Sequence, residues 1–433
     1  MTATESPRGA PRYDPRLIDT ELDELLPGLP AIALEGPRGV GKTSTGSRRA
    51  RTTFLLDQPA VRELLAAAPE QLVDSKPPVL IDEWQLYPAV WDLVRRAIDA
   101  DPSPGRFLLT GSAEPARRPT HSGAGRIVGL RMRPLALSER GLLPAAVSLR
   151  ELLSGTSPLV SGHSHLTLSD YTQEIVRSGF PAIRRLEQRA CRLALDSYLA
   201  RILERDFAEQ GHAVRRPNTL RNWLAAYAAA TATNTSYESI RDAASPGYHE
   251  TPAKTTVDLY REVLMQLWLL DPLPAWSPSR NNLSRLGAAP KHHLADPALA
   301  ARLLGANHSS LLSNDVAGPP VPRNGTLLGA LFESLVALSI RVLAQTCDAT
   351  VSHLRTREGR HEIDLIVQRD DAKVVAFEVK LAGAVSDDDV QHLRWLQSKL
   401  GDDLLDAAVI TTGQDAYRRR DGIAVIPAAL VGP

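Results

Sequence analysis

Cysteine is scarce in this chain, and neither sign of charge dominates it. The 2 cysteines, Cys191 and Cys347, lie far apart, which excludes a disulfide framework and a cysteine-based metal site. Such low thiol usage fits a reducing cytoplasm. The 50 basic residues balance the 50 acidic ones, so no overall field attracts nucleic acid or an anionic membrane. Any contact with DNA must therefore come from a local patch.

Targeting and membrane signals are also missing from the sequence. Residues 1–16 combine proline, arginine and acidic residues without an apolar core, so they do not form a secretory signal. The longest apolar stretches, such as residues 223–232, fall well short of the roughly 20 residues that span a membrane. Hydrophobic residues make up 43% of the 433 residues, which is typical of a globular protein with two or three domains. We expect a cytoplasmic protein without membrane contact.

Residues 15–140 alternate between short apolar runs and helical stretches. The strand-like runs are residues 31–35, 53–56, 79–81 and 107–109. Residues 89–100 form the clearest helical stretch between them. Short apolar strands that alternate with helices are typical of a parallel sheet covered on both faces. The pattern predicts an α/β domain over residues 15–140.

A phosphate-binding loop follows the first of these strands. The segment fits the loop pattern at every required position and reads Gly36, Pro37, Arg38, Gly39, Val40, Gly41, Lys42, Thr43, followed by Ser44. Its glycines let backbone N–H groups turn inward around phosphates. Lys42 is expected to reach the β and γ oxygens, and Thr43 to ligate Mg²⁺. The loop predicts that ATP and Mg²⁺ are the cofactors.

Two adjacent acids, Asp82 and Glu83, end the apolar run at residues 79–81. At the end of a strand beside a phosphate loop, Asp82 is expected to support the metal. Glu83 is expected to orient the attacking water and to act as the general base. Alternatively, both acids are solvated groups that cap a strand.

Hydroxyl groups and an arginine complete the expected ATP site. Thr110 and Ser112 follow the strand at residues 107–109 and are candidate sensors of the γ-phosphate. An ordinary strand-ending turn explains the same residues. Arg126 precedes the expected strand at residues 127–130 and is a candidate arginine finger that reaches a neighbouring subunit of a homo-oligomer. The alternative for Arg126 is an ordinary surface side chain.

The middle of the chain divides into a polar stretch and a helical region. Residues 141–168 are rich in Ser, Gly and Pro and are expected to form a linker or an exposed elaboration. Residues 169–316 are expected to be helical, with a candidate helix-turn-helix at residues 239–244 and 255–270. Residues 268–276 and 291–294 would supply a wing. Basic and acidic residues are nearly balanced here, so a helical packing domain explains the pattern equally well.

A third domain is expected over residues 326–433, and it holds a second polar cluster. Asp364 lies on one expected strand, and Glu378 and Lys380 share one face of the next. This spacing matches the PD-(D/E)xK arrangement of metal-dependent nucleases, in which carboxylates hold Mg²⁺. Glu333 on the preceding helix and Gln391 on the following one lie where accessory residues of that family lie. Three interpretations remain: an active nuclease, a nuclease fold without catalysis, and a salt-bridged surface.

The order of these motifs resembles one known group of proteins. Besides the phosphate loop and the two acids, the chain has residues 107–113 (FLLTGSA), residues 134–139 (PLALSE) and residues 329–333 (GALFE). It resembles the bacterial and archaeal AAA+-type ATPases with a C-terminal domain of unknown function, DUF4143. The resemblance implies an AAA+-like core, a winged-helix middle domain and a restriction-endonuclease-like C-terminal domain. Trp84 departs from the Ile or Val that is common in the family, without affecting the acids.

The sequence therefore predicts a Mg²⁺-dependent ATPase. Its nucleotide state would be coupled to a module that binds DNA or a partner protein. One alternative is an ATP-gated DNA endonuclease centred on Asp364, Glu378 and Lys380. Another is a nucleotide-sensing scaffold with little turnover.

Overall fold

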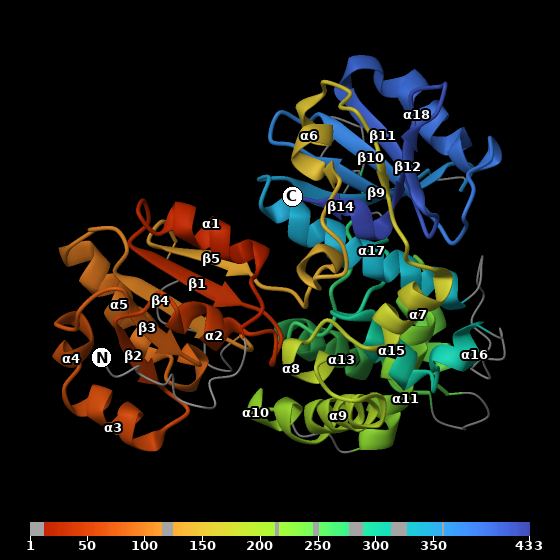
Figure 1. The fold of residues 1–433 in the computed structure, drawn as a ribbon. Helices are drawn as coiled ribbons and strands as arrows, with labels where there is room; N and C mark the ends of the chain where they lie inside the picture. The colour runs from red at the N-terminus through yellow and green to blue at the C-terminus, as the bar shows by residue number, and fades with distance from the viewer. Residues whose placement is uncertain are drawn as a thin grey trace, which may run out of the picture.

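The computed structural model describes residues 13–114, 124–212, 216–245, 251–276, 289–312, 327–356 and 359–433. Figure 1 shows three bodies: an N-terminal sheet domain on the left, a helical domain at the lower right and a C-terminal sheet domain above it. One hydrophobic cluster is continuous through parts of all three, since it includes Leu34, Trp223 and Phe377. The bodies therefore share a core.

The N-terminal sheet has five strands in the order β2-β3-β4-β1-β5, and every neighbouring pair is parallel. The strands are β1 (Ala31–Glu35), β2 (Thr52–Leu55), β3 (Val79–Asp82), β4 (Phe107–Gly111) and β5 (Ile127–Arg131). The helices are α1 (Leu17–Leu25), α2 (Lys42–Ser47), α3 (Pro59–Ala67), α4 (Glu70–Val73) and α5 (Ala89–Ala100). The predicted parallel sheet is confirmed, with strand ends within one or two residues of those expected.

Alternate residues of each strand pack on opposite faces of this sheet. Ile32 and Leu34 of β1 belong to the cluster that contains α1, whereas Ala31 and Ala33 belong to the cluster that contains α5. Burial on both faces explains why β1, β3 and β4 are apolar up to their carboxyl ends. The carboxyl ends of β1, β3 and β4 meet at one edge, where open α/β sheets bind ligands.

The helical domain packs around α11, whose Trp223 and Tyr227 are both fully buried. Its helices are α7 (Leu168–Val176), α8 (Pro181–Arg184), α9 (Gln188–Arg201), a π-helical segment (Ile202–Asp206), α10 (Phe207–Glu209), α11 (Pro217–Ala229), α12 (Tyr237–Ala243), α13 (Lys254–Gln266), α15 (Pro297–Leu303) and α16 (His308–Leu312). The two helices expected for a helix-turn-helix exist as α12 and α13. The winged-helix assignment itself stays a prediction.

Both segments of the expected wing, residues 268–276 and 291–294, lie within the described residues, whereas most of the stretch between them does not. Leu270 pairs with Leu294, and Leu273 pairs with Lys291, both antiparallel. These four side chains are buried, so the described part of the hairpin packs inside the protein. The boundary expected between the helical region, residues 169–316, and the third domain, residues 326–433, lies outside the described residues.

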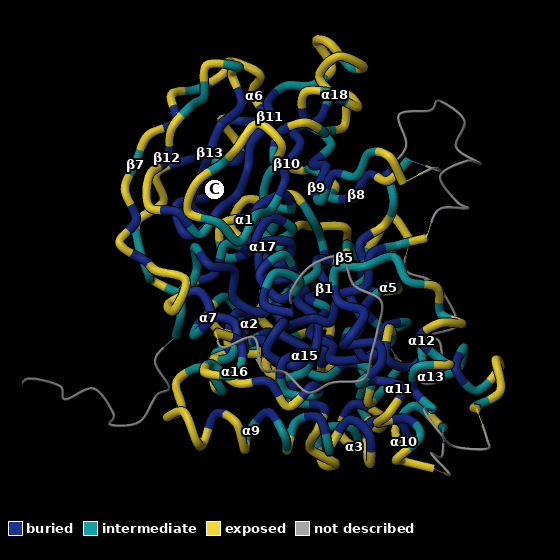
Figure 2. The backbone as a smooth tube through the Cα atoms, turned by 90° about the vertical axis from the view of Figure 1, so that its right-hand side faces the viewer, coloured by how far each residue is buried: buried dark blue, intermediate teal, exposed yellow. Residues whose placement is uncertain are grey.

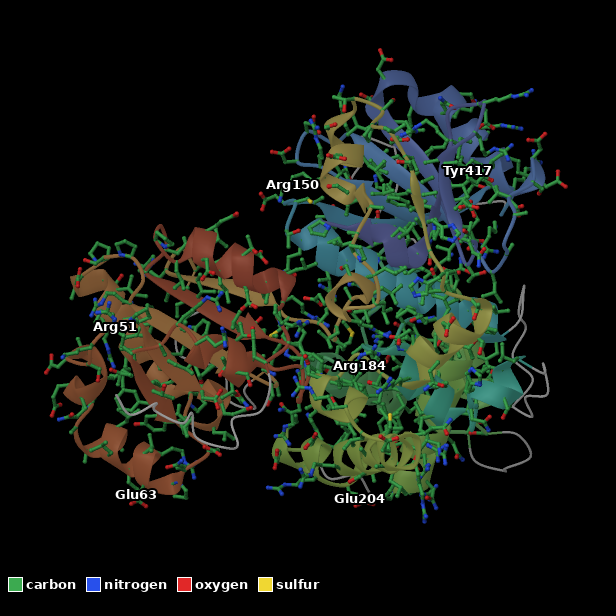
Figure 3. The ribbon with its side chains drawn as sticks, viewed as in Figure 1. Arg51, Glu63, Arg150, Arg184, Glu204 and Tyr417 are labelled. Carbon is green, nitrogen blue, oxygen red and sulfur yellow. The ribbon has the colours of Figure 1, made fainter. Side chains whose placement is uncertain are left out.

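Residues 141–168, expected as a linker or an exposed elaboration, are folded onto the C-terminal domain. They form β6 (Val147–Ser148), α6 (Leu149–Ser154) and β7 (Gly162–His163). Strand β7 pairs with residues 415–416, and β6 pairs with residues 431–432. Arg150 of α6, labelled in Figure 3, donates to the carbonyl oxygen of Thr346 at 2.6 Å. These pairings could not be predicted from the sequence, because the partners of β6 and β7 lie far along the chain.

The C-terminal domain contains a seven-stranded mixed sheet in the order β7-β12-β13-β11-β10-β9-β8. Its own strands are β8 (Thr350–Arg355), β9 (Glu362–Gln368), β10 (Val374–Lys380), β11 (Leu404–Thr411), β12 (Asp415–Arg418) and β13 (Ala424–Pro427), and the short β14 (Val431–Gly432) pairs with β6. Helices α17 (Leu327–Gln345) and α18 (Gln391–Leu400) pack on opposite faces. The helices with Glu333 and Gln391 and the strands with Asp364 and Glu378, all predicted from the sequence, are present as α17, α18, β9 and β10.

Helix α17 corrects the expectation that every apolar stretch is too short to span a membrane. Of the helices in the described ranges, α17 alone is long and apolar enough to cross one by length and composition. Its most apolar window is 72% buried inside the protein. Figure 2 shows it largely dark blue between the sheet and the helical domain. Its apolar character is accounted for by this packing.

Candidate functional site

The backbone of the phosphate loop fits only glycine at its entrance. Gly36 follows β1 with φ 155°, and a Cβ atom placed there would lie 2.1 Å from the carbonyl oxygen of Met132. Gly41 caps the first turn of α2 with φ 103°. These two positions require glycine for packing and for a left-handed backbone, respectively. The loop connects the carboxyl end of β1 to the start of α2 and so lies at the carboxyl edge of the sheet.

Lys42 is folded back onto its own loop. Its Nζ donates to the carbonyl oxygens of Gly36 at 2.7 Å and Pro37 at 2.9 Å, and the residue is only 5% exposed. Burial lowers the pKa of Lys42 to about 8, although Glu83 and Asp82 oppose this shift. The ammonium thus has backbone partners and, within the described part of the chain, no direct carboxylate partner.

Asp82 stands between two hydroxyl groups. Its Oδ1 accepts hydrogen bonds from Thr43 Oγ1 at 2.8 Å and from Thr110 Oγ1. Burial raises the pKa of Asp82, and the two hydroxyl donors counteract that rise. Thr43 and Asp82 provide adjacent hard oxygen donors, so they fit Mg²⁺, which takes few protein ligands when phosphates supply the rest.

Glu83 has an unusual backbone and a fixed side chain. It adopts a left-handed conformation, φ 55° and ψ 46°, which is rare for residues other than glycine and clusters at functional sites. Its Oε2 accepts hydrogen bonds from Ser112 Oγ at 2.6 Å and from Gln85 Nε2. Thr110 and Ser112, the candidate sensors, therefore each hold one of the two acids. Sequence reasoning missed Gln85.

Arg38 connects the phosphate loop to the helical domain. Its guanidinium donates to Asp206 Oδ1 at 2.6 Å and to Glu209 Oε2 at 2.7 Å. Its carbonyl oxygen accepts a hydrogen bond from Tyr198 at 3.2 Å. Asp206 closes the π-helical segment, a distortion that is frequent at functional sites. These partners lie 160 to 171 positions from Arg38 along the chain, so no local signal could have found them.

Arg126 lies at the opposite edge of the sheet from the phosphate loop. It precedes Ile127, which pairs with Ala31 at the start of β1, whereas the loop follows the end of β1. Arg126 Nε donates to Asp99 Oδ1 at 2.6 Å, and the side chain is 44% exposed. It cannot serve the site of its own chain. Its action across a subunit boundary stays a prediction.

The polar residues of the C-terminal domain converge on one cavity of about 670 Å³. Asp364 of β9, Glu378 and Lys380 of β10 and Glu333 of α17 all line it. We call this cavity the carboxylate pocket. Gln391 is exposed and lies outside the lining, and the adjacent His392 lines it instead, because one step along α18 turns a side chain by about 100°.

A lysine that sequence reasoning missed occupies the centre of the carboxylate pocket. Nζ of Lys291 lies 2.8 Å from Asp364 Oδ1, 3.0 Å from Glu333 Oε1 and 3.0 Å from Glu362 Oε1. Lys291 belongs to the hairpin of the helical domain, not to the C-terminal sheet. Its position in the sequence gave no indication of this contact.

Comparison with known families divides the chain in the same way as the fold. Residues 29–140 match an AAA domain, and residues 328–431 match the domain of unknown function DUF4143. The chain therefore carries an AAA domain and, at its C-terminal end, a DUF4143 domain. Residues 168–310, between them, match another domain of unknown function, DUF8612. The AAA match supports a nucleotide-binding protein of the ATPase class, as the phosphate loop predicts.

Two curated proteins are similar to almost the whole AAA–DUF4143 chain. Both are uncharacterized proteins, one from Mycobacterium tuberculosis and one from Mycobacterium bovis. Each is 25% identical over 408 residues, which cover 92% of this chain and 80% of the relative. The similarity extends through all three domains, so the domain order is shared.

Protonation in the DUF4143 pocket follows from burial and from Lys291. Burial, followed by the charge of Asp364, raises the pKa of Glu333 to about 8, although Lys291 opposes the rise. Burial also raises the pKa of Glu378 well above its usual range. For Asp364 burial is outweighed by the ammonium groups of Lys291 and Lys380, which lower its pKa. Asp364 is therefore the firmly ionised acid of the pocket.

A buried ion cluster joins the AAA, helical and DUF4143 domains. Asp271 contacts Arg133 at 2.8 Å and Arg131 at 3.3 Å, both after or at the end of β5, and Arg341 of α17 at 2.8 Å. Burial opposes ionisation of Asp271, but the three arginines lower its pKa far below the usual range. Arg131 also stacks over Trp268, 4.2 Å from the ring centre. The edge of the nucleotide site is thus tied to both other domains.

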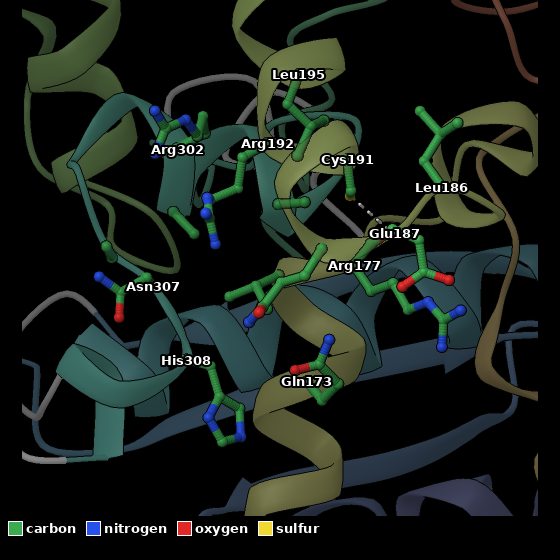
Figure 4. Close-up of a pocket in the computed structure, with 15 residues that line it drawn as sticks. Gln173, Arg177, Leu186, Glu187, Cys191, Arg192, Leu195, Arg302, Asn307 and His308 are labelled. Atoms are coloured by element: carbon green, nitrogen blue, oxygen red, sulfur yellow. Dashed lines mark hydrogen bonds between the residues drawn. The ribbon is translucent and has the colours of Figure 1, made fainter.

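The DUF8612 region contains a cleft of its own, of about 330 Å³ (Figure 4). Arg177, Arg192, Arg302 and His308 contribute basic groups to its lining. Cys191 Sγ lies 3.7 Å from the carbonyl oxygen of Arg177, the contact drawn as a dashed line. Basic groups outnumber acidic ones in this lining, although the region as a whole is nearly balanced.

Proposed function

We propose that this protein binds ATP with Mg²⁺ at the phosphate loop, hydrolyses it and passes the nucleotide state to the helical domain. The observation that carries the proposal is the convergence of Lys42, Thr43, Asp82 and Glu83 at one edge of the parallel sheet. This edge is where open α/β sheets bind their ligands. The AAA match over residues 29–140 supports the same activity.

Each residue has a separate role in this proposal. Lys42 exchanges its hydrogen bonds to the carbonyl oxygens of Gly36 and Pro37 for hydrogen bonds to phosphate oxygens. The negative charge of the phosphates stabilises the protonated form of Lys42, which burial disfavours. Thr43 and Asp82 would hold Mg²⁺, which neutralises charge on the phosphates. Thr110 keeps the Asp82 carboxylate oriented through their hydrogen bond.

Glu83 is the proposed general base. Its Oε2 is fixed by Ser112 and Gln85, so the carboxylate needs little reorganisation before it accepts a proton from water. A left-handed backbone turns this side chain out of the strand direction of β3. The same hydrogen bonds make Ser112 and Gln85 positioning residues.

Arg38 is the proposed link between nucleotide state and the helical domain. Phosphates bound in the loop would compete with Asp206 and Glu209 for the guanidinium, since Arg binds phosphate and carboxylate with the same donor geometry. Binding of ATP would thereby loosen the contact at the π-helical segment. The helical domain in turn would present a surface to DNA or to a partner protein.

The decisive experiment compares Glu83→Gln with the parental protein. The variant should bind ATP with parental affinity and lose about 10²- to 10⁴-fold in hydrolysis, the usual contribution of a general base. Glu63→Gln on the exposed face of α3, labelled in Figure 3, makes the same chemical change and should leave hydrolysis unchanged. Parental hydrolysis by Glu83→Gln would rule out Glu83 as the base.

The same measurement separates the alternative functions. A parental protein that binds ATP but shows no measurable hydrolysis would be a nucleotide-sensing scaffold. Stimulation of hydrolysis by duplex DNA would identify DNA as the partner of the helical domain. Unchanged hydrolysis with DNA would favour a protein partner instead.

Hydrolysis as a function of protein concentration tests the proposed role of Arg126 in a homo-oligomer. If Arg126 acts across a subunit boundary, activity per chain should rise with concentration, and Arg126→Ala should lower hydrolysis with little loss of ATP binding. A monomer that is fully active at high dilution would exclude this role.

A further inference from the structure

The carboxylate pocket has the acids of a metal site but a different cation. We propose that Lys291 is the resident cation of this pocket, in the place where a nuclease of the PD-(D/E)xK type holds a divalent metal. A residue of the helical domain thus closes the DUF4143 pocket from outside its own sheet. The inference concerns this pocket alone and does not depend on ATP hydrolysis.

Lys291 is held by three carboxyl groups. Its Nζ donates hydrogen bonds to Glu333 and Asp364, and Oε1 of Glu362 lies within ion-pair distance at 3.0 Å. Lys291 is 1% exposed, so salt screens these contacts much less than it screens contacts at the surface. One positive charge therefore joins α17 and β9 to the helical domain.

Both oxygens of Asp364, the residue most needed by a metal, already accept a hydrogen bond, so a bound ion would have to share an oxygen with one of these donors. Its Oδ1 accepts from Lys291 at 2.8 Å, and its Oδ2 accepts from the backbone N–H of Val379 at 2.9 Å. A divalent ion bound here would also lie against the Lys291 ammonium, which costs like-charge repulsion. Across the described residues, no group of three or more His, Cys, Asp or Glu side chains is placed to hold a metal.

Glu378 shows that the pocket retains an unused ligand group. Its Oε2 contacts Lys380 at 3.2 Å, whereas its Oε1 is buried without a hydrogen-bond partner in the described structure. Glu378 itself is 3% exposed and lines the pocket. An oxygen of this kind would gain a partner if a cation could approach it. Lys291 reaches Asp364 but not this oxygen.

The backbone holds Lys291 in this position. Its N–H donates to the carbonyl oxygen of Leu273 at 3.0 Å, and the N–H of Leu273 donates back to the carbonyl oxygen of Lys291 at 2.9 Å. The next residue, His292, donates to the carbonyl oxygen of Thr233 at 2.8 Å. These backbone hydrogen bonds fix the position of the hairpin, and so they hold the ammonium of Lys291 in the pocket.

Removal of the ammonium should convert the pocket into a metal site. Binding of Mn²⁺ to the full-length chain without nucleotide can be counted by the loss of the free Mn²⁺ signal in electron paramagnetic resonance. Lys291→Met should bind one more Mn²⁺ per chain than the parental protein. The double variant Lys291→Met with Asp364→Asn should lose that ion, because hard oxygen ligands are required.

Controls distinguish this pocket from the nucleotide site. Lys380→Met removes the other lysine that lines the pocket but retains Lys291, and it should not gain a Mn²⁺ ion. Any Mn²⁺ held by Thr43 and Asp82 is present in every variant and cancels in the comparison. A folded Lys291→Met protein that binds no additional Mn²⁺ would overturn the proposal.

The parental protein provides a test that does not depend on the folding of a lysine variant. Parental protein and Asp364→Asn should bind equal numbers of Mn²⁺ ions, since Lys291 already occupies Asp364. An Asp364-dependent Mn²⁺ ion in the parental protein would also overturn the proposal. Failure here would leave the Glu83→Gln experiment unaffected, so the two proposals fail separately.

Discussion

The nucleotide site and the DUF4143 pocket both contain a buried lysine and acidic side chains, but the two lysines have different partners. Lys42 lies near Asp82 and Glu83 at the end of β3, and Lys291 lies beside Glu333 of α17 and two acids of β9, Glu362 and Asp364. Lys42 donates to backbone carbonyl oxygens, whereas Lys291 donates directly to carboxylates. Burial accordingly lowers the pKa of Lys42 to about 8, whereas the carboxylates raise the pKa of Lys291 well above its usual value despite burial.

This difference shows which partners leave a buried lysine able to bind an anionic ligand and which partners neutralise it. A lysine held only by carbonyl dipoles can improve its interactions when a polyanion arrives. A lysine surrounded by three carboxylates is already neutralised, and its removal would leave the acids uncompensated. The first arrangement suits an exchangeable ligand, and the second suits a permanent structural contact.

The largest expected effect is on ATP binding, which should depend on Lys42 but not on Lys291. Lys42→Ala should weaken ATP binding by about 100-fold, corresponding to about 2.7 kcal/mol for a lost charged hydrogen-bond donor. Its melting temperature should not fall, because the folded protein loses a charge whose burial was unfavourable. Calorimetry with ATP measures the affinity. Lys76→Ala, which alters an exposed lysine of the same domain, should bind ATP normally.

Lys291→Ala should give the reverse pattern. Loss of the ammonium leaves Asp364, Glu333 and Glu362 without their shared partner, which should cost about 3–5 kcal/mol of unfolding free energy. ATP affinity should stay at the parental value. Chemical denaturation measures the stability change, with Lys399→Ala on the exposed side of α18 as the control. Equal stability of both variants would contradict the comparison.

The pH dependence of ATP affinity should sharpen the comparison between Lys42 and Lys291. Lys42 has a folded-state pKa lowered to about 8, so the empty site loses its ammonium as the pH rises through that value. Bound phosphates require the protonated form, and affinity should therefore fall about tenfold per pH unit above pH 8. Titration calorimetry in buffers of different ionisation enthalpy should reveal proton uptake on binding. Affinity that is constant from pH 7 to pH 9.5 would exclude this role of Lys42.

The smallest expected effect concerns the contact between the AAA and helical domains. Arg38→Ala removes the bonds to Asp206 and Glu209, so amide hydrogen exchange in α9 and α10 should rise severalfold without nucleotide. Addition of ATP to the parental protein should produce a similar rise. Arg205→Ala also removes a bond to Glu209 but lies within the helical domain, and it should not reproduce the effect.

Much of the AAA domain could be predicted because its signals are local. The phosphate loop is one continuous segment, and its glycines, lysine and threonine are fixed by the backbone geometry of a strand–loop–helix unit. Asp82 and Glu83 follow an apolar run, so their place at a strand end could be read directly. Strand alternation likewise brought Asp364, Glu378 and Lys380 to one pocket.

Contacts between distant segments could not be predicted in this way. Residues 141–168 have no periodic pattern, yet they add β7 to a sheet whose partner strand begins at Asp415. Gln391 was placed from its position in the sequence, but the helix phase brings His392 to the pocket. Helix phase and strand pairing depend on packing against the remainder of the molecule, which a single sequence does not display.

The sequence by itself determined the parallel sheet, the phosphate loop and the acids of both sites, because short-range spacing dictates which side chains share a strand end or a face. The tertiary structure alone decided which charges meet. Arg38 reaches Asp206 and Lys291 reaches Asp364 across domain boundaries, where proximity results from the packing of a shared core. Charge pairing depends on distance in space, and so the same acids became an open site in one domain and an occupied one in the other.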